Sequence, residues 1–172
     1  MNPNESATRA FLPALYAVAA LFLIAPVTDL LGLTWPVRVA EAGWRFGSIG
    51  LGFEKAFVQI IGLTLGMGLA AFLGHRRLLR SLSALSLTAA FLVCAAMVRF
   101  ILDFGDLRAL VPALELERFD ANAYRATLYA ILAVPVLVVL GGRAWNASAR
   151  VDGKSLSELD ERVIPLYRRR GS

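Results

Sequence analysis

The sequence predicts an all-α integral membrane protein, built as a bundle of four transmembrane helices. Apolar residues make up 58% of the 172 residues, charged residues only 18%, and the mean hydropathy is +0.62. Soluble domains usually carry about 25% charged residues. The apolar residues also gather into long runs without the alternating pattern of barrel strands, which favours helices. This composition excludes a disordered chain, and the single cysteine excludes a disulfide scaffold.

Four apolar runs are candidates for membrane spans: residues 10–31, 53–74, 82–102 and 123–142. A helix of about 17–25 apolar residues crosses a hydrocarbon core about 30 Å thick, so each run is long enough. The first run is longer than the apolar part of a secretory signal, so we expect it to be retained. Residues 1–145 then form the membrane domain and residues 146–172 a basic tail.

The basic residues predict the orientation of these spans. With four spans both termini lie on one side, together with the Arg76–Arg80 turn and the tail. That side carries an excess of arginine and lysine, and such an excess marks the cytoplasmic face. We therefore expect both termini in the cytoplasm. The preference for arginine over lysine suggests a GC-rich bacterial genome, and hence the inner membrane of a bacterium.

The two links on the predicted outer side are semi-apolar. Residues 34–52 place Trp35 and Trp44 among apolar and charged side chains, which predicts a short helix lying in the headgroup region. The second link, residues 103–125, has aliphatic residues at helical spacing, although Pro112 interrupts them. Asp120 is a candidate cap for the start of the fourth span.

Small residues recur every fourth position in the second and third spans. Close approach along such ridges is what holds helices together in lipid, so we expect the two ridges to face each other. The alternatives are that they reflect the usual membrane composition or that they face a partner protein. The helix-packing residues are Gly62, Gly66, Ala70 and Gly74 in the second span, and Ser86, Ala90 and Cys94 in the third.

The tail is predicted to contain one short helix. Ser155 to Glu158 form a capping box that opens it, and Pro165 stops it after about Val163. Trp145 marks the inner interface. The terminal arginines Arg168, Arg169 and Arg170 are expected to lie on anionic lipid headgroups or, alternatively, to dock an acidic partner.

Charged and polar residues from three spans share one depth near the outer ends. Their members are Asp29, Glu54, Lys55, Gln59, Arg99, Asp103 and Asp106. Arg99 and Asp103 are i, i+4 neighbours on one helical face. A charge inside a span usually pairs or faces water. The group therefore forms either interfacial ion pairs that fix helix register, which we favour, or a small vestibule that admits an ion, a proton or a headgroup.

The residue types that build most catalytic and metal sites are scarce. One histidine, His75, and one cysteine cannot form a bis-histidine haem site or a zinc cluster, so we predict no metal and no cofactor, while a bound lipid or pigment stays compatible with the sequence. The expected partners are the bilayer and other membrane subunits or further copies of this chain, and no nucleic acid. A membrane-embedded enzyme is least favoured, since only Asp29, Glu54 and Asp103 offer a carboxylate site.

Two functions follow from this pattern. The favoured one is a non-catalytic accessory or scaffold subunit of a larger inner-membrane complex, of the kind found in energy-transducing or photosynthetic assemblies. The alternative is a small oligomeric transporter, channel or lipid-binding protein that uses the outward-facing charged residues.

Overall fold

The computed structural model describes the backbone of residues 3–168 and the side chains of residues 11–149. In this range the chain folds into four α-helices: α1 (Pro3–Thr34), α2 (Ala42–Phe72), α3 (Arg76–Arg108) and α4 (Leu116–Arg168). Each helix contains a segment long and apolar enough to cross a membrane. The predicted all-α class is confirmed for the described residues, and the four helices are compatible with a multi-pass membrane protein.

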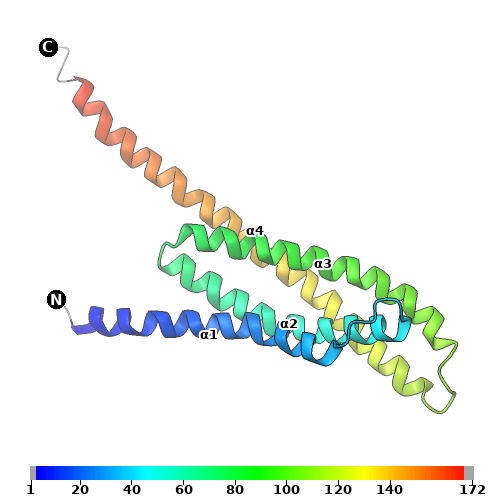
Figure 1. Cartoon of the computed structure of the whole chain (residues 1–172). Helices are drawn as coiled ribbons and strands as arrows, with labels where there is room; N and C mark the ends of the chain where they lie inside the picture. Colours follow the sequence, from blue (N-terminus) through cyan, green and yellow to red (C-terminus); the bar gives the residue numbers. More distant parts are fainter. Residues whose placement is uncertain (1–2, 169–172) are drawn as a thin grey trace.

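Helices α2, α3 and α4 pack against one another, and α1 packs against α2 alone among the described helices. Figure 1 shows α1 lying along the outside of α2, while α4 crosses behind α3 and continues past the bundle. The α2–α3 turn lies at the same end as the start of α1, and the α1–α2 and α3–α4 links lie together at the opposite end (Figure 1). We call these the turn end and the link end.

The interfacial helix predicted between residues 34 and 52 is not formed as a separate element. Instead α2 begins at Ala42, just after a turn in which the Glu41 N–H donates to the Arg38 carbonyl at 2.9 Å. Phe46, in the first turns of α2, stacks on Phe100 of α3 with the ring centroids 4.2 Å apart. The apolar face of this stretch therefore packs on the bundle itself, which extends α2 beyond the predicted span.

The second predicted interfacial helix is likewise absent from the described chain. Helix α3 ends at Arg108 and residues 109–115 form a turn-rich link, in which Pro112 lacks a backbone donor and restricts the residue before it. Helix α4 begins at Leu116, so Asp120 lies inside it and is not its cap. Its carboxylate instead accepts hydrogen bonds from Arg108 at 2.8 and 2.9 Å, which ties the ends of α3 and α4 together.

The separate helix predicted in the tail is also not formed, because α4 runs unbroken from Leu116 to Arg168. A capping box matters only where a helix starts, and at Ser155 the helix is already under way. Pro165 lies within the last turns, where it removes one backbone hydrogen bond without ending the helix. The side chain of Arg168, and Arg169 and Arg170 entirely, lie outside the described residues.

The turn between α2 and α3 depends on Gly74, whose φ is 69°. The N–H of His75 donates to the Ala70 carbonyl at 2.8 Å, and the N–H of Gly74 donates to the Ala71 carbonyl at 3.3 Å. This is the Schellman pattern, in which glycine adopts the left-handed conformation that ends a helix. Gly74 thus ends α2 and, contrary to the prediction, is not part of a packing ridge.

Candidate functional site

Five of the seven residues predicted to form one group lie in three separate clusters near the link end. Asp103 and Arg99 of α3 join Arg45 of α2. Glu54 of α2 pairs with Arg125 of α4. Each of the three clusters joins a different pair of helices. The charged residues are therefore distributed around the bundle and do not surround one opening.

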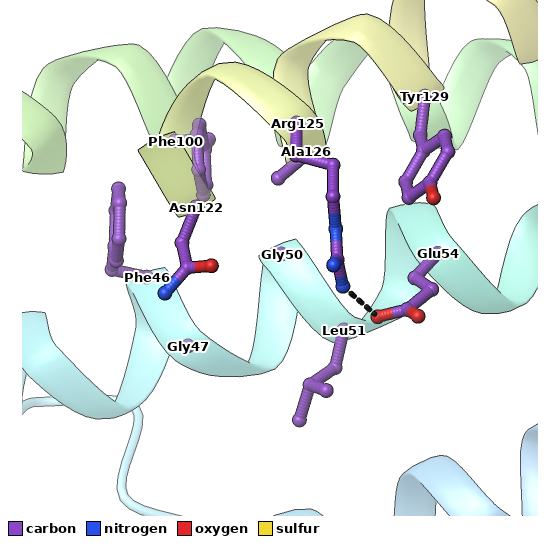
Figure 2. A pocket seen from close by; sticks show the side chains of 10 residues that line it. All are labelled: Phe46, Gly47, Gly50, Leu51, Glu54, Phe100, Asn122, Arg125, Ala126 and Tyr129. Carbon is purple, nitrogen blue, oxygen red and sulfur yellow. Dashed lines mark hydrogen bonds and ion pairs between the residues drawn. The ribbon is translucent and has the colours of Figure 1, made fainter. Parts of the chain in front are cut away.

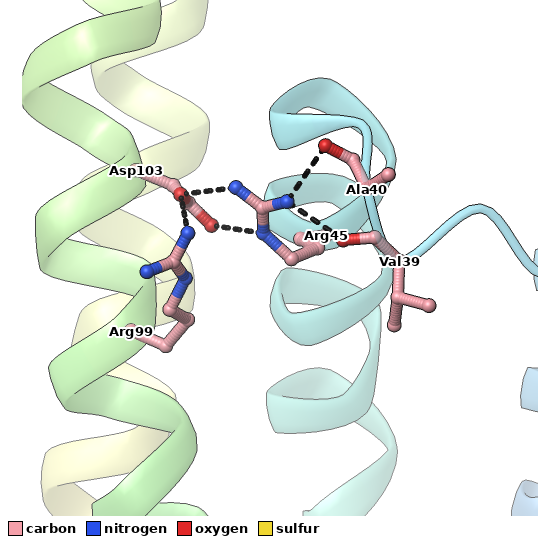
Figure 3. Close-up of polar contacts among 5 residues, drawn as sticks. All are labelled: Val39, Ala40, Arg45, Arg99 and Asp103. Carbon is pink, nitrogen blue, oxygen red and sulfur yellow. Dashed lines mark hydrogen bonds and ion pairs between the residues drawn. The ribbon is translucent and has the colours of Figure 1, made fainter.

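The cluster around Asp103 is the most buried. The Asp103 side chain is 3% exposed, yet it accepts from two arginines. Arg45 binds it with one edge of its guanidinium, at 2.9 Å from Nη2 to Oδ1 and 3.1 Å from Nε to Oδ2. Arg99 Nη2 lies 3.0 Å from the same Oδ1 (Figure 3). We call Arg45, Asp103 and Arg99 the arginine–aspartate triad.

The backbone of the α1–α2 link holds Arg45 in place. Arg45 Nη1 donates to the carbonyls of Val39 at 2.7 Å and Ala40 at 3.0 Å, as Figure 3 shows. These bonds and the two to Asp103 occupy four of the five N–H donors of the guanidinium. Arg99, in contrast, makes one bond to Asp103 and its side chain is 50% exposed. Two arginines around one aspartate leave the triad with a formal charge of +1.

Sequence reasoning identifies the Arg99–Asp103 pair and misses Arg45. The first two are four residues apart on one helix, and that spacing alone predicts their contact. Arg45 lies 58 residues from Asp103, in a segment predicted to be an interfacial link. The signal that could have found it is the continuation of apolar residues from Phe46 onward, which indicates that α2 starts before Arg45.

The second cluster lines a pocket of about 180 Å³ between α2 and α4. Figure 2 shows Glu54 and Arg125 reaching toward each other across it, 3.4 Å apart, with the Tyr129 ring beside them. The Arg125 guanidinium carbon lies 5.9 Å from the centroid of that ring, within the range of a cation–π contact. The pair is about half exposed, so it contributes little to stability.

The third cluster and two further predicted residues lie apart from both. Lys55 Nζ of α2 donates to Asp29 Oδ2 of α1 at 2.9 Å, which joins these helices. Asp106 is exposed, one turn beyond Asp103 on α3, and Gln59 is half-buried on α2. The structure therefore does not bring Gln59 and Asp106 to the triad.

The predicted packing residues of α2 face α1 and, at one point, α3. A Cβ at Gly62 would lie 3.0 Å from the Ala19 carbonyl oxygen of α1, and one at Gly66 would lie 3.1 Å from Leu82 of α3. Ala70 is fully buried in the core. The prediction that the two ridges face each other is therefore wrong at Gly62, where α1 lies against α2.

Of the predicted ridge of α3, Ser86 packs directly against α4. Ser86 is buried and its hydroxyl donates to the Leu137 carbonyl at 2.8 Å, and Ser83, which lies outside the predicted ridge, donates to the Gly141 carbonyl at 2.6 Å. Ala90 is buried in a core cluster that also contains Ala70 of α2 and Leu137 of α4. Cys94, in contrast, is exposed and takes no part in this packing. Hydroxyl groups that bind carbonyls of a neighbouring helix are a common way of joining helices in lipid.

The three tryptophans differ in exposure. Trp35 is 76% exposed in the link and Trp145 is 50% exposed on α4, and their contact with lipid or a partner stays a prediction. Trp44 is half-buried, and its indole N–H donates to the Thr34 carbonyl at 2.9 Å, across the α1–α2 link. It also lines an apolar groove of about 400 Å³ that α1, α2 and α3 enclose.

No group of three or more potential metal-ligating side chains occurs within residues 11–149, the part whose side chains are described. His75 lies at the turn end, where its Nδ1 is 2.9 Å from the Tyr16 hydroxyl. Comparison with known proteins finds no matching family model, no matching curated protein and no matching solved structure.

Proposed function

We propose that the chain is a non-catalytic accessory or scaffold subunit of a larger membrane complex, whose partner helices pack along α1. The observation that carries this proposal is the position of α1, which packs against α2 alone among the described helices. In a closed four-helix bundle each helix packs against two neighbours. The free side of α1 leaves room for a helix of another chain.

The face of α1 opposite its buried Ala19 supports this proposal. Helical geometry places Ala14, Ala17, Leu21 and Ile24 on that face, and all four are exposed. It combines small residues, which permit close approach, with large aliphatic ones, which supply contact area. Such a face suits a partner helix as well as lipid, so its role must be tested by substitution.

The pairing of the charged residues also favours a structural role over a vestibule. Arg45–Asp103 joins α2 to α3, Glu54–Arg125 joins α2 to α4, and Lys55–Asp29 joins α1 to α2. Charges that neutralise one another between helices fix the relative positions of those helices. A transport route would instead need a series of polar groups that a moving ion could bind in turn.

We further propose that the complex lies in the inner membrane of a bacterium, with the turn end in the cytoplasm. Three arginines in the first turns of α3, Arg76, Arg77 and Arg80, support this orientation, since basic residues are enriched in and beside short cytoplasmic loops. The link end, with its ion pairs, then faces the outside.

Extraction of the tagged chain from its native membrane in a mild detergent tests the subunit role. We expect native gels and native mass spectrometry to show a complex with a fixed ratio of this chain to at least one different membrane protein. Ala17→Phe, which adds bulk to the free face of α1, should reduce the amount of that partner by about tenfold, equivalent to about 1.4 kcal/mol of binding. The chain itself should remain in the membrane.

Ala84→Phe provides the matched control, because Ala84 is exposed on α3 and the same bulk is added there. This variant should retain the partner. A wild-type chain that runs only as a monomer or homodimer would contradict the proposal, and so would equal loss of the partner in both variants.

A further inference from the structure

An apolar groove opens toward the surrounding membrane between α1 and α3. Its floor is α2, which contributes Ile49, Gly52 and Phe53, and Leu30 of α1 and Ala96 of α3 stand on opposite sides. The groove measures about 400 Å³, within the range of ligand pockets. Because α1 and α3 do not pack against each other, no helix of the described chain closes it.

The arginine–aspartate triad lies at the link end of this groove. Arg45 itself lines the groove. Leu92 and Ala96 also line it, and Arg99 follows them at i+7 and i+3, so all three share one face of α3. Arg99 therefore lies on the face of α3 that borders the groove, one turn beyond Ala96 toward the link end, and its side chain is 50% exposed. Figure 3 shows it beside Asp103, across from the groove-lining Arg45.

The charge of the triad is not balanced by its own residues. Arg45 and Arg99 share the single carboxylate of Asp103, which leaves a charge of +1 at the edge of an apolar region. A charge there is unfavourable unless it pairs or reaches water. Asp106, the next acidic residue of α3, makes no ion pair with either arginine among the described contacts.

We infer that this groove binds one anionic glycerophospholipid, with its phosphate on Arg99 and one acyl chain along Ile49, Gly52 and Ala96. Arg99 uses one N–H on Asp103, so several donors remain for two phosphate oxygens, the bidentate geometry that guanidinium favours. A lipid with a charge of −1 brings the triad to neutrality. A zwitterionic lipid does not, because its ammonium group restores the excess positive charge.

Two residues beside the triad fit the region between phosphate and acyl chain. Ser48 lies on the groove wall close to one turn beyond Arg45, where its hydroxyl can donate to an ester carbonyl. Trp44 lines the same end with its N–H already bound to Thr34, so its ring is held at the groove. Tryptophan is enriched at the level of the headgroups. The lipid site rests on these contacts and does not depend on the proposed subunit role.

Native mass spectrometry of the purified full chain, titrated with phosphatidylglycerol or phosphatidylcholine, tests the inference. We expect one phosphatidylglycerol to bind at least about tenfold more tightly than phosphatidylcholine. Arg99→Gln, which keeps the Arg45–Asp103 pair, should lose this preference, and Arg99→Lys should keep most of it. The matched control is Arg118→Gln, since Arg118 is exposed near the start of α4 and the same charge is removed at the same end.

A groove-filling variant tests the acyl chain separately from the headgroup. A Cβ at Gly52 would have only Leu30 near it, at 3.9 Å, so Gly52→Leu should fold and place its side chain in the groove. It should weaken phosphatidylglycerol binding by about tenfold. Circular dichroism and gel filtration would check the fold of every variant.

Any of four results would overturn the lipid site. Two concern the headgroup: equal binding of the two lipids by the wild-type chain, and an unchanged preference in Arg99→Gln. The other two concern the acyl chain. In one, Gly52→Leu binds phosphatidylglycerol as tightly as the wild-type chain does. In the other, the water-soluble headgroup glycerophosphoglycerol competes for the site as strongly as the intact lipid. The last result would indicate an anion site without an acyl chain. None of these results depends on whether a partner protein co-purifies.

Discussion

At the residue scale, Gly141 permits the close approach of α4 to α3. A Cβ at this position would lie 2.8 Å from Leu87 Cγ and 3.2 Å from the Ser83 carbonyl oxygen. The Gly141 carbonyl also accepts the Ser83 hydroxyl at 2.6 Å. A methyl group at residue 141 must therefore push the helices apart and lengthen that hydrogen bond. We predict that Gly141→Ala lowers the free energy of unfolding by about 1–3 kcal/mol, the usual effect of overpacking.

The neighbouring residue supplies the control for this prediction. A Cβ at Gly142 would meet no atom within 4 Å, so Gly142→Ala adds the same methyl group without a collision. Thermal unfolding in detergent, followed by tryptophan fluorescence, compares the two variants. The unfolding temperature of Gly142→Ala should equal that of the wild type or lie slightly above it, because alanine has a higher helix propensity than glycine. Equal destabilisation by both substitutions would mean that the close approach of α3 and α4 does not depend on the absence of a side chain at residue 141.

The charged residues show which contacts a sequence can predict at this scale. The pairing of Arg99 with Asp103 is predictable because helix geometry fixes the distance between residues four apart. The stronger partner, Arg45, cannot be assigned in this way, since a contact over 58 residues depends on how α2 and α3 pack. The same limit applies to Glu54 and Arg125. Their types and depth are visible in the sequence, while their partners are a property of the fold.

At the scale of elements, the attachment of α1 to α2 depends on Gly62. A Cβ there would lie 3.0 Å from the Ala19 carbonyl oxygen and 3.0 Å from Leu23 Cγ, both on α1. Since α1 has no other neighbour among the described helices, only the contacts near its ends, such as Lys55–Asp29 and Tyr16–His75, remain if this one fails. We predict that Gly62→Val displaces α1 and lowers the free energy of unfolding by about 1–3 kcal/mol.

The ion pair between α1 and α2 provides a direct measurement of this displacement. A zero-length carbodiimide cross-linker should couple Lys55 to Asp29, whose charged atoms lie 2.9 Å apart, and mass spectrometry detects the joined peptides. Gly62→Val should reduce the yield of this product to a minor fraction. Gly68→Val, on an exposed side of α2 with no neighbour within 4 Å, should leave the yield unchanged. A normal yield in Gly62→Val would show that α1 is held by other contacts.

The elements themselves are easier to predict than their ends and partners. Long apolar runs identify the four helices, and each helix is long and apolar enough to cover the hydrocarbon thickness. The predicted start of α2 is too late, since residues 42–52 mix charged, aromatic and small side chains and match an interfacial helix equally well. Small residues at every fourth position do not all lie on packing faces, since Gly62 and Ser86 are buried whereas Gly74 and Cys94 are exposed. The spacing also does not reveal which helix packs at each position, for example α1 at Gly62 and α4 at Ser86. A face of small residues fits any neighbouring helix.

At the scale of the whole molecule, the two ends of the bundle differ in the way their charges are used. The link end carries acidic and basic residues joined in pairs, among them Arg45–Asp103 and Arg108–Asp120. The turn end carries the basic stretch from His75 to Arg80, with no acidic residue between them. Translocation across a bacterial inner membrane is hindered by short loops rich in arginine, whereas balanced loops cross. We therefore predict that the link end lies outside and the turn end inside.

Cysteine labelling in intact cells tests this orientation, starting from Cys94→Ala to remove the single native thiol. Leu114→Cys lies in the α3–α4 link, where Leu114 is fully exposed, and should react with a membrane-impermeant maleimide at once. Leu78→Cys, at the turn end, should react only after the cells are permeabilised. The reverse pattern would place the arginine-rich turn outside and contradict the orientation. Labelling of both positions in intact cells would mean that the chain inserts in two directions, which the charge difference between its two ends argues against.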